Sequence, residues 1–191
     1  MSSSASSHPE PLPLARRISI VGPSGSGKSV LSRTLAEKLS LPHVELDQLR
    51  HAHSSDADPD AEFVRLVTAR TADPAWIMDG HYRLVRETIW HRADLIIWLN
   101  YPLGFVLLRL AGRFVARLTI REGSSEGVSS VPSASWARRF GRLTRTVRER
   151  REYRRLLTAA ARRGAILVEL RSEAETRAWL GLIEAGDHAG R

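Results

Sequence analysis

A glycine-rich segment near the start of the chain constrains the fold most strongly. It occupies residues 22–29 and reads GPSGSGKS, between the β-branched run RRISIV and a stretch with apolar residues at helical spacing, 29–39. Glycines allow positive φ and close approach to a ligand, so that successive N–H groups and a helix N-terminus can surround an anion. The segment fits G-x-x-x-x-G-K-[ST] at every fixed position, which predicts a phosphate-binding loop between a strand and a helix.

The side chains of this phosphate loop (residues 22–29) have expected roles toward a nucleoside triphosphate. Lys28 supplies a positive charge for the β- and γ-phosphates, and the Ser29 hydroxyl is a ligand for Mg²⁺. We therefore predict binding of ATP together with Mg²⁺. The residues expected to contact the nucleotide are Gly22, Pro23, Ser24, Gly25, Ser26, Gly27, Lys28, Ser29 and Val30.

Short apolar runs alternate with amphipathic segments along the rest of the chain. Five strands alternating with helices predict an α/β fold, a doubly wound parallel sheet with helices on both faces. The strands are expected at 16–21, 43–46, 76–80, 94–100 and 165–170, and the helices at 29–39, 61–70, 84–91, 103–118, 136–162 and 173–183.

Composition agrees with one such domain. The chain has 191 residues, of which 42% are hydrophobic and 26% charged, as in globular proteins. We expect a disordered tail at 1–15, a domain at 16–185 that includes a lid region at about 109–148, and a flexible C-terminus at 186–191.

The absence of cysteine from the sequence excludes disulfides, zinc–thiolate sites and a cysteine nucleophile. No apolar run is long enough for a membrane span, and the first fifteen residues lack the pattern of a signal peptide. We therefore expect a cytoplasmic protein without a membrane partner, either a monomer or a homodimer.

Two aspartates end predicted strands. Asp47 ends HVELD, and Asp79 is followed by a glycine in WIMDG. Ligands bind beyond the carboxyl ends of strands in open α/β sheets, so both carboxylates are expected to face the phosphate loop. Asp79 is expected to orient Mg²⁺, and Asp47 to accept a proton from the attacking hydroxyl or to hold the acceptor. The structural alternative for both is a helix N-cap or turn carboxylate.

The residues after Asp79 are candidates for binding the acceptor. Gly80 permits close approach or a tight turn, and His81 and Arg86 are expected on the first turns of the next helix, with Tyr82 and Arg83. Arg86 is the expected anion ligand, and a solvated helix start is the alternative. His51 and His53 are expected to be exposed, and no structural metal is predicted.

The formal net charge of +8 is concentrated between residues 109 and 155, where thirteen arginines and four glutamates give +9. Several of these arginines share a helical face before the Gly/Ser-rich stretch 122–135, and others share a face after it. A closing lid would use such arginines to neutralise the transferred phosphoryl group and to exclude water. The arginines at this spacing are Arg109, Arg113 and Arg117, followed by Arg138, Arg142 and Arg145.

Two other interpretations of this arginine-rich segment (109–155) remain open. A basic stripe attracts nucleic-acid phosphates irrespective of sequence, although the segment has few aromatic residues for base stacking. A solvated helix with glutamate pairs is the other alternative, especially near residues 150–155. On the lid interpretation, the catalytic residues are Lys28, Asp47, Asp79, Arg109, Arg113, Arg138 and Arg142.

These segments resemble the adenylate-kinase-like P-loop kinases, and most closely the small DNA topology modulation proteins. GPSGSGKSVLSRTLAEKLSLPHVELDQL is similar to their opening, WIMDGHYR to their Asp-Gly strand end, and ADLIIWLNYP to their fourth strand. RLAGR, with Arg109 and Arg113, resembles the arginine pair that opens the lid of nucleoside monophosphate kinases. The resemblance covers about residues 16–183 and implies a five-stranded sheet of order 2-3-1-4-5 with an arginine-rich helical lid.

The expected function is an ATP- and Mg²⁺-dependent phosphotransferase. A GTPase is not expected, because the fourth predicted strand lacks a following Asn-Lys-x-Asp segment, and no acid pair typical of large ATPases ends that strand. The γ-phosphate would pass to a nucleotide or to a small hydroxyl or phosphate acceptor. The alternative is an ATP-binding or ATPase protein that docks on DNA through residues 109–155.

Overall fold

A computed structural model describes residues 15–52, 57–109, 111–112 and 150–189. Its centre is a five-stranded sheet of order β2-β3-β1-β4-β5, in which every neighbouring pair is parallel. This confirms the predicted fold class and strand order. The strands are β1 (Arg17–Val21), β2 (His43–Glu45), β3 (Trp76–Asp79), β4 (Leu95–Leu99) and β5 (Ile166–Leu170).

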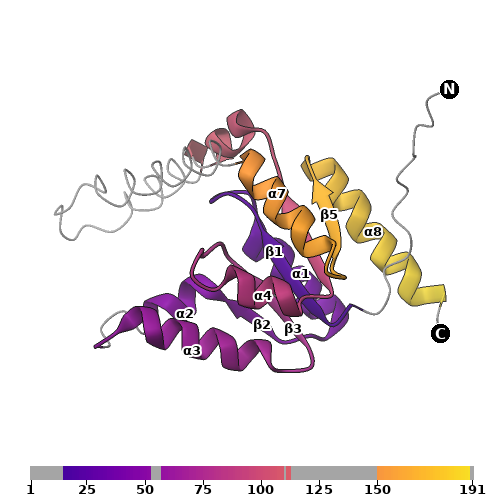
Figure 1. The fold of residues 1–191 in the computed structure, drawn as a ribbon. Helices are drawn as coiled ribbons and strands as arrows, with labels where there is room; N and C mark the ends of the chain where they lie inside the picture. The colour runs from indigo at the N-terminus through magenta and orange to yellow at the C-terminus, as the bar shows by residue number, and fades with distance from the viewer. Residues whose placement is uncertain (1–14, 53–56, 110, 113–149, 190–191) are drawn as a thin grey trace, which may run out of the picture.

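Helices cover both faces of the sheet. Figure 1 shows α2 and α3 beside β2 at one end of the sheet and α8 beside β5 at the other. Residues 103–109, which follow β4, are also helical. The other described helices are α1 (Lys28–Leu39), α2 (Leu46–Ala52), α3 (Pro59–Thr71), α4 (Arg86–Arg92), α7 (Arg150–Ala161) and α8 (Glu173–Ala189).

Alternate residues of the central strands enter two separate apolar clusters, because successive side chains of a strand point to opposite faces. On one face Ile20 and Ile97 pack with Leu35 of α1 and Trp179 of α8. On the other face, side chains such as Trp98 pack with residues of α3, α4 and α7. The carboxyl edge of the sheet is therefore bordered by α1 and α8 on one face and by α4 and α7 on the other.

The region around the second and third strands differs from the sequence prediction. Leu46 does not extend β2 but begins α2, a helix that was not predicted. Helix α4 begins at Arg86 and not at Leu84, because the backbone N–H groups of Val85 and Arg86 bond to the carbonyl of Tyr82 in a preceding turn. His81 and Tyr82 thus lie in a connecting loop, not on the first turns of a helix as predicted.

The remaining boundaries are partly described. The closing helix α8 continues to Ala189, past the predicted end at residue 183. Of the predicted helices 103–118 and 136–162, the structure describes residues 103–109, 111–112 and 150–161 as helical. The predicted tail and lid boundaries stay predictions. Within the described ranges, no helix has the length and apolar character that a membrane crossing requires.

Candidate functional site

The phosphate loop connects β1 to α1 in the predicted strand–loop–helix arrangement. Its three glycines, at 22, 25 and 27, all have positive φ. A Cβ on Gly22 would lie 2.8 Å from the carbonyl oxygen of Leu99, so only glycine lets the loop pass this close to the end of β4. The loop is therefore held against the carboxyl edge of the sheet, at the N-terminus of α1.

Lys28 lies within this loop. Its Nζ donates a hydrogen bond of 2.9 Å to the carbonyl oxygen of Pro23. Burial lowers the pKa of Lys28, while the negative charges of Asp79 and Asp47 raise it. The structure therefore brings both predicted aspartates within electrostatic range of the predicted lysine.

Asp79 ends β3 and is almost fully buried, with 3% of its surface exposed. Its Oδ1 lies 3.6 Å from Nε2 of His43, and its Oδ2 has no hydrogen-bond partner. Burial raises the pKa of the Asp79 carboxyl, against the opposing effects of a hydrogen bond with Ser29 and of the charges of His43 and Lys28. The end of strand β3 thus places the Asp79 carboxylate near the first turn of α1, which contains Ser29.

This pair of oxygen donors fits Mg²⁺. The ion prefers oxygen ligands and is usually held by one or two protein groups together with substrate phosphates. Asp79 has a buried Oδ2 without a partner, and its carboxyl group interacts with the Ser29 hydroxyl, so the two side chains together meet that description. Asp79 and Ser29 are therefore the residues that would hold the metal.

Asp47 lies in the first turn of α2, directly after β2, and its side chain is anchored from another segment. The hydroxyl of Tyr82 donates a hydrogen bond of 2.7 Å to Asp47 Oδ1. Gly80 makes this arrangement possible, because it has a φ of 141° and a Cβ there would lie 2.8 Å from Cβ of Leu46. The start of α2 can therefore pack against the end of β3, which carries Asp47 to the loop that contains Tyr82.

Arg86 and His81 lie on the face of the sheet bordered by α4 and α7. The Nε of Arg86 is buried without a hydrogen-bond partner, and its nearest carboxylate oxygen, on Glu87, is 3.8 Å away. The His81 ring packs against Tyr153 of α7, with 4.6 Å between the ring centroids. The two predicted acceptor ligands thus share a neighbourhood with a tyrosine from a distant helix.

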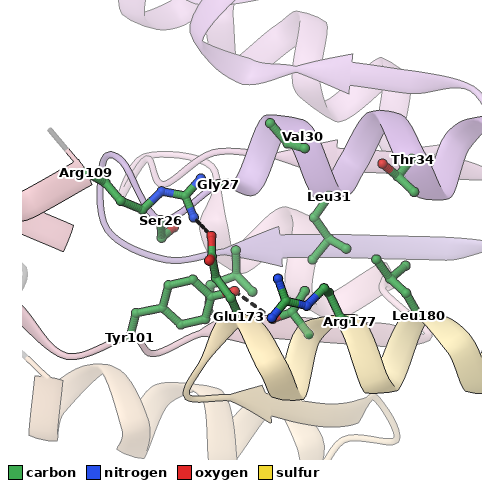
Figure 2. Close-up of a pocket in the computed structure, with 12 residues that line it drawn as sticks. Ser26, Gly27, Val30, Leu31, Thr34, Tyr101, Arg109, Glu173, Arg177 and Leu180 are labelled. Carbon is green, nitrogen blue, oxygen red and sulfur yellow. Dashed lines mark hydrogen bonds and ion pairs between the residues drawn. The ribbon is translucent and has the colours of Figure 1, made fainter. Parts of the chain in front are cut away.

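A cavity of about 170 Å³ opens beside the phosphate loop on the other face, between α1 and α8 (Figure 2). The predicted nucleotide-binding residues Ser26, Gly27 and Val30 line it on one side. Its remaining walls combine apolar side chains with a few polar ones, as small-molecule pockets do. These residues include Leu31, Thr34, Tyr101, Thr176, Arg177 and Leu180.

Arg109 closes one end of this cavity. Its guanidinium forms an ion pair with Glu173, the first residue of α8, and lies 5.6 Å from the ring centroid of Phe105. Guanidinium nitrogens come within 4.0 Å of the Cβ position of Gly27. The structure thus brings the predicted Arg109 to the phosphate loop, with its guanidinium over the ring of Phe105.

The other predicted lid arginines, Arg113, Arg138 and Arg142, lie outside the described residues. At the end of the arginine-rich segment, Arg154 forms a 2.8 Å ion pair with Glu169 of β5 and lies 5.1 Å from the Trp98 ring centroid. Arg154 therefore pairs with a carboxylate of the sheet, while about half of its side chain stays exposed.

Sequence reasoning missed several residues that line the site. Glu173 and Thr176 lie directly after β5, and the rule that ligands bind at carboxyl ends of strands could have identified them. Tyr101 bonds to Thr176 through its hydroxyl at 2.6 Å, a contact between segments with no local pattern to reveal it.

Comparison with known proteins agrees with the resemblance to kinases. Residues 18–100 match a family model described as an AAA domain. Adenylate kinase of Streptomyces coelicolor is 28% identical over 173 residues, covering 71% of this chain and 80% of that protein. Adenylate kinase of Streptomyces lividans is 29% identical over 172 residues, covering 71% and 86%.

A solved structure supports the fold. The crystal structure of shikimate kinase from Bacteroides thetaiotaomicron matches with a TM-score of 0.53 at 14% identity, covering 89% of this chain and 99% of that one. The finer resemblance to DNA topology modulation proteins stays a prediction. The chain therefore has the fold of a P-loop kinase and is similar in sequence to adenylate kinases.

Proposed function

We propose that this protein is an ATP- and Mg²⁺-dependent phosphotransferase that moves the γ-phosphate of ATP to a small-molecule or nucleotide acceptor. The observation that carries the proposal is the grouping of Lys28, Ser29 and Asp79 at the N-terminus of α1, with an unpartnered carboxylate oxygen in the buried interior. The similarity to adenylate kinases supports it independently.

The phosphate loop and the adjoining cavity form the ATP side of the site. Loop N–H groups and Lys28 surround the phosphates, and release of Lys28 from the Pro23 carbonyl frees its ammonium for them. The cavity between α1 and α8 receives the base, since it adjoins Gly27 and has apolar walls. The flat guanidinium of Arg109, backed by Phe105, stacks on the base or contacts a phosphate.

Ser29 and Asp79 hold Mg²⁺ in this proposal. When bound, the ion neutralises charge on the β- and γ-phosphates. Asp79 is suited to this role because its carboxylate is buried and has an oxygen available. A localised positive charge compensates the cost of keeping that carboxylate ionised away from water.

The acceptor lies on the other side of the phosphate loop, near Asp47, Gly80, His81 and Arg86. Asp47 accepts the proton of an attacking hydroxyl, or fixes the acceptor by a hydrogen bond. Its hydrogen bond from Tyr82 orients the carboxylate and leaves Oδ2 for the acceptor. Transfer then takes place at the carboxyl edge of the sheet, where the two sides meet.

The proposed lid arginines are Arg109, Arg113, Arg138 and Arg142, in a lid at about 109–148. Lid closure would exclude water and neutralise the transferred group. We do not propose docking on DNA, because no contact of the described residues favours it. We further propose a cytoplasmic protein that acts as a monomer or a homodimer.

The test is transfer of labelled phosphate from [γ-³²P]ATP with Mg²⁺ to a panel of nucleotides, nucleosides and small alcohols. We expect at least one labelled product with the parent protein and none with Lys28→Ala. Lys38→Ala is the matched control, because Lys38 is the only other lysine in the sequence and lies exposed at the far end of α1. Hydrolysis to free phosphate with every acceptor, at a rate unchanged by Lys28→Ala, would overturn the proposal.

A further inference from the structure

Four aromatic side chains meet on the face of the sheet bordered by α4 and α7, and a buried arginine adjoins them. Tyr153 of α7 packs against His81, Trp90 and Trp98, with ring centroids 4.6, 5.5 and 5.9 Å away. Arg86 lies four residues before Trp90 on the same helix, α4. Residues at this spacing share a helical face, and the positive charge of Arg86 acts on the pKa of the Tyr153 hydroxyl, so the two side chains lie near each other.

Two polar atoms of this group lack hydrogen-bond partners. They are Nε of Arg86 and the hydroxyl oxygen of Tyr153, and both are buried. The Tyr153 residue is 5% exposed, and the Arg86 side chain is 17% exposed. Buried donors without partners are costly in a folded protein, and a guanidinium is more costly than a neutral group. Their coincidence at one place indicates that a ligand supplies the missing acceptor.

The neighbouring charges indicate the sign of that ligand. The Glu87 carboxylate is 3.8 Å from Arg86 Nε, too far for a hydrogen bond, and its other oxygen is 3.4 Å from Arg163. Glu87 is also largely exposed, so it compensates Arg86 only weakly. Burial raises the pKa of the Tyr153 phenol, while the positive charge of Arg86 opposes that shift. The phenol therefore stays protonated at neutral pH and is a hydrogen-bond donor.

We propose that Arg86 and Tyr153 form a subsite for an anionic group of the acceptor, a carboxylate or a phosphate. This inference rests on the proposed function and narrows its acceptor to molecules with such a group beside the phosphorylated atom. Arg86 supplies the charge, the Tyr153 hydroxyl supplies a second donor, and the His81 ring packed on Tyr153 restricts its orientation. Because Tyr153 belongs to α7, acceptor binding also engages the helix that ends the arginine-rich segment.

The experiment follows the Arg86 Nε–H group directly. The full chain is saturated with Mg²⁺ and a non-hydrolysable ATP analogue, so that the phosphate loop is filled, and is titrated with inorganic phosphate or with acetate. Arginine Nε–H signals are recorded by ¹⁵N NMR at constant ionic strength. We expect one signal, missing from the Arg86→Lys spectrum, to shift and saturate with one or both anions.

Variants distinguish anion binding at this subsite from nonspecific attraction of anions by the positive charge of the protein. In calorimetric titrations with the same anions, Arg86→Lys should weaken anion binding about tenfold and Tyr153→Phe several-fold, because each removes one directed donor. Arg70→Lys is the matched control, since Arg70 is exposed at the end of α3, away from the site, and it should leave the affinity unchanged. An Arg86 signal that responds to neither anion, or an Arg70→Lys variant weakened as much as Arg86→Lys, would overturn the subsite. The titration of the parent protein still tests whether the subsite binds an anion, even if a variant does not fold.

Different results would contradict the proposed function and the anion subsite. If no acceptor is phosphorylated while the Arg86 signal still responds to an anion, the proposed function is wrong and Arg86 belongs to an anion-binding site of another role. If an acceptor is phosphorylated with a KM that Arg86→Lys and Tyr153→Phe leave unchanged, the function stands and the subsite is wrong.

Discussion

The two sides of the carboxyl edge of the sheet differ in how their polar groups are satisfied. On the α1–α8 face, Lys28 bonds to Pro23, Arg109 pairs with Glu173, and Tyr101 bonds to Thr176. On the α4–α7 face, the Arg86 Nε and the Tyr153 hydroxyl have no partner. On the first side the charged groups are paired within the chain, and among the described residues that line its cavity the Ser26 hydroxyl oxygen is the buried polar atom without a partner. On the second side a guanidinium nitrogen and a phenol oxygen lack partners, and on our proposal an anionic ligand completes them.

The difference also concerns distance along the sequence. On the α1–α8 side, the main binding element is the contiguous phosphate loop. The conformation of this loop depends mainly on its glycines and on the start of the helix that follows it. The α4–α7 side needs α2, the loop after β3 and α7 to come together. Nucleotide binding should therefore survive changes that disrupt the acceptor side.

The largest expected effect is on Asp79→Asn. The amide keeps the shape but removes the negative charge that would hold Mg²⁺, so turnover should fall about 100- to 1,000-fold. Steady-state kinetics at saturating Mg²⁺ measure this loss, and circular dichroism confirms folding. Asp73→Asn, at an exposed turn after α3, is the control and should leave turnover unchanged. Unchanged turnover in Asp79→Asn would remove this carboxylate from the mechanism.

Gly80→Ala should be the most destabilising of these variants. It combines a φ of 141° with a Cβ placed 2.8 Å from Cβ of Leu46, so we expect a loss of about 3 kcal/mol. Gly164→Ala is the matched control, because Gly164 also has a positive φ, 114°, but a Cβ there would have no neighbouring atom within 4 Å. This variant should lose about 1–2 kcal/mol of stability. Urea unfolding measures both free energies. Equal losses would mean that close packing of α2 on β3 is unimportant.

Arg109→Ala should weaken ATP binding about tenfold, because it removes a guanidinium from the edge of the cavity. The protein should remain folded, since the pair with Glu173 is partly exposed and such pairs contribute little to stability. Calorimetric titration with ATP and Mg²⁺ measures the affinity. Arg70→Ala, on the exposed end of α3, is the control, and equal affinities in the two variants would contradict the role of Arg109.

Tyr82→Phe should lower turnover about fivefold while ATP affinity stays constant. The change removes the 2.7 Å hydrogen bond to Asp47 Oδ1 but keeps the aromatic packing on Phe63, so the carboxylate loses its orientation. A change in ATP affinity with unaltered turnover would show that the two sides are not separated as described.

Asp94→Asn tests the opposite edge of the sheet, far from both sides of the site. Burial alone would raise the pKa of Asp94, but hydrogen bonds from the Arg17 side chain and from the N–H groups of Arg16 and Arg17 hold it below its usual value. The variant should lose about 1 kcal/mol of stability at pH 7, with activity unchanged. A depressed folded pKa stabilises above the unfolded value, so this difference should shrink as pH falls below about 4. A loss that persists at pH 2 would contradict this ion pair.

Much of the fold was predictable because it depends on local patterns. Alternating apolar runs and amphipathic segments identified all five strands, while their order came from the resemblance to kinases. Helix α2 was missed, because it follows β2 without a turn and its Leu46 continues an apolar strand pattern. Its position depends on packing against Gly80, a contact that no local pattern contains.

The candidate site was predictable to the same extent. The phosphate loop is one contiguous motif, and Asp79 follows from its place at a strand end. The bond between Tyr82 and Asp47 joins residues 35 positions apart, and Tyr153 comes from the far end of the domain. Such partners depend on tertiary packing, so the sequence made Arg86 a candidate anion ligand but gave no indication of Tyr153.

The most direct test of the central claim, that donor and acceptor meet at the carboxyl edge of this sheet, is a crystal structure with Mg²⁺ and a non-hydrolysable ATP analogue. The account predicts the γ-phosphate within hydrogen-bond distance of Lys28 Nζ, with Mg²⁺ bound to Ser29 and Asp79 and the base between α1 and α8. It also predicts that the γ-phosphate faces Asp47. A triphosphate bound away from residues 22–29, or a γ-phosphate directed away from Asp47, would contradict it.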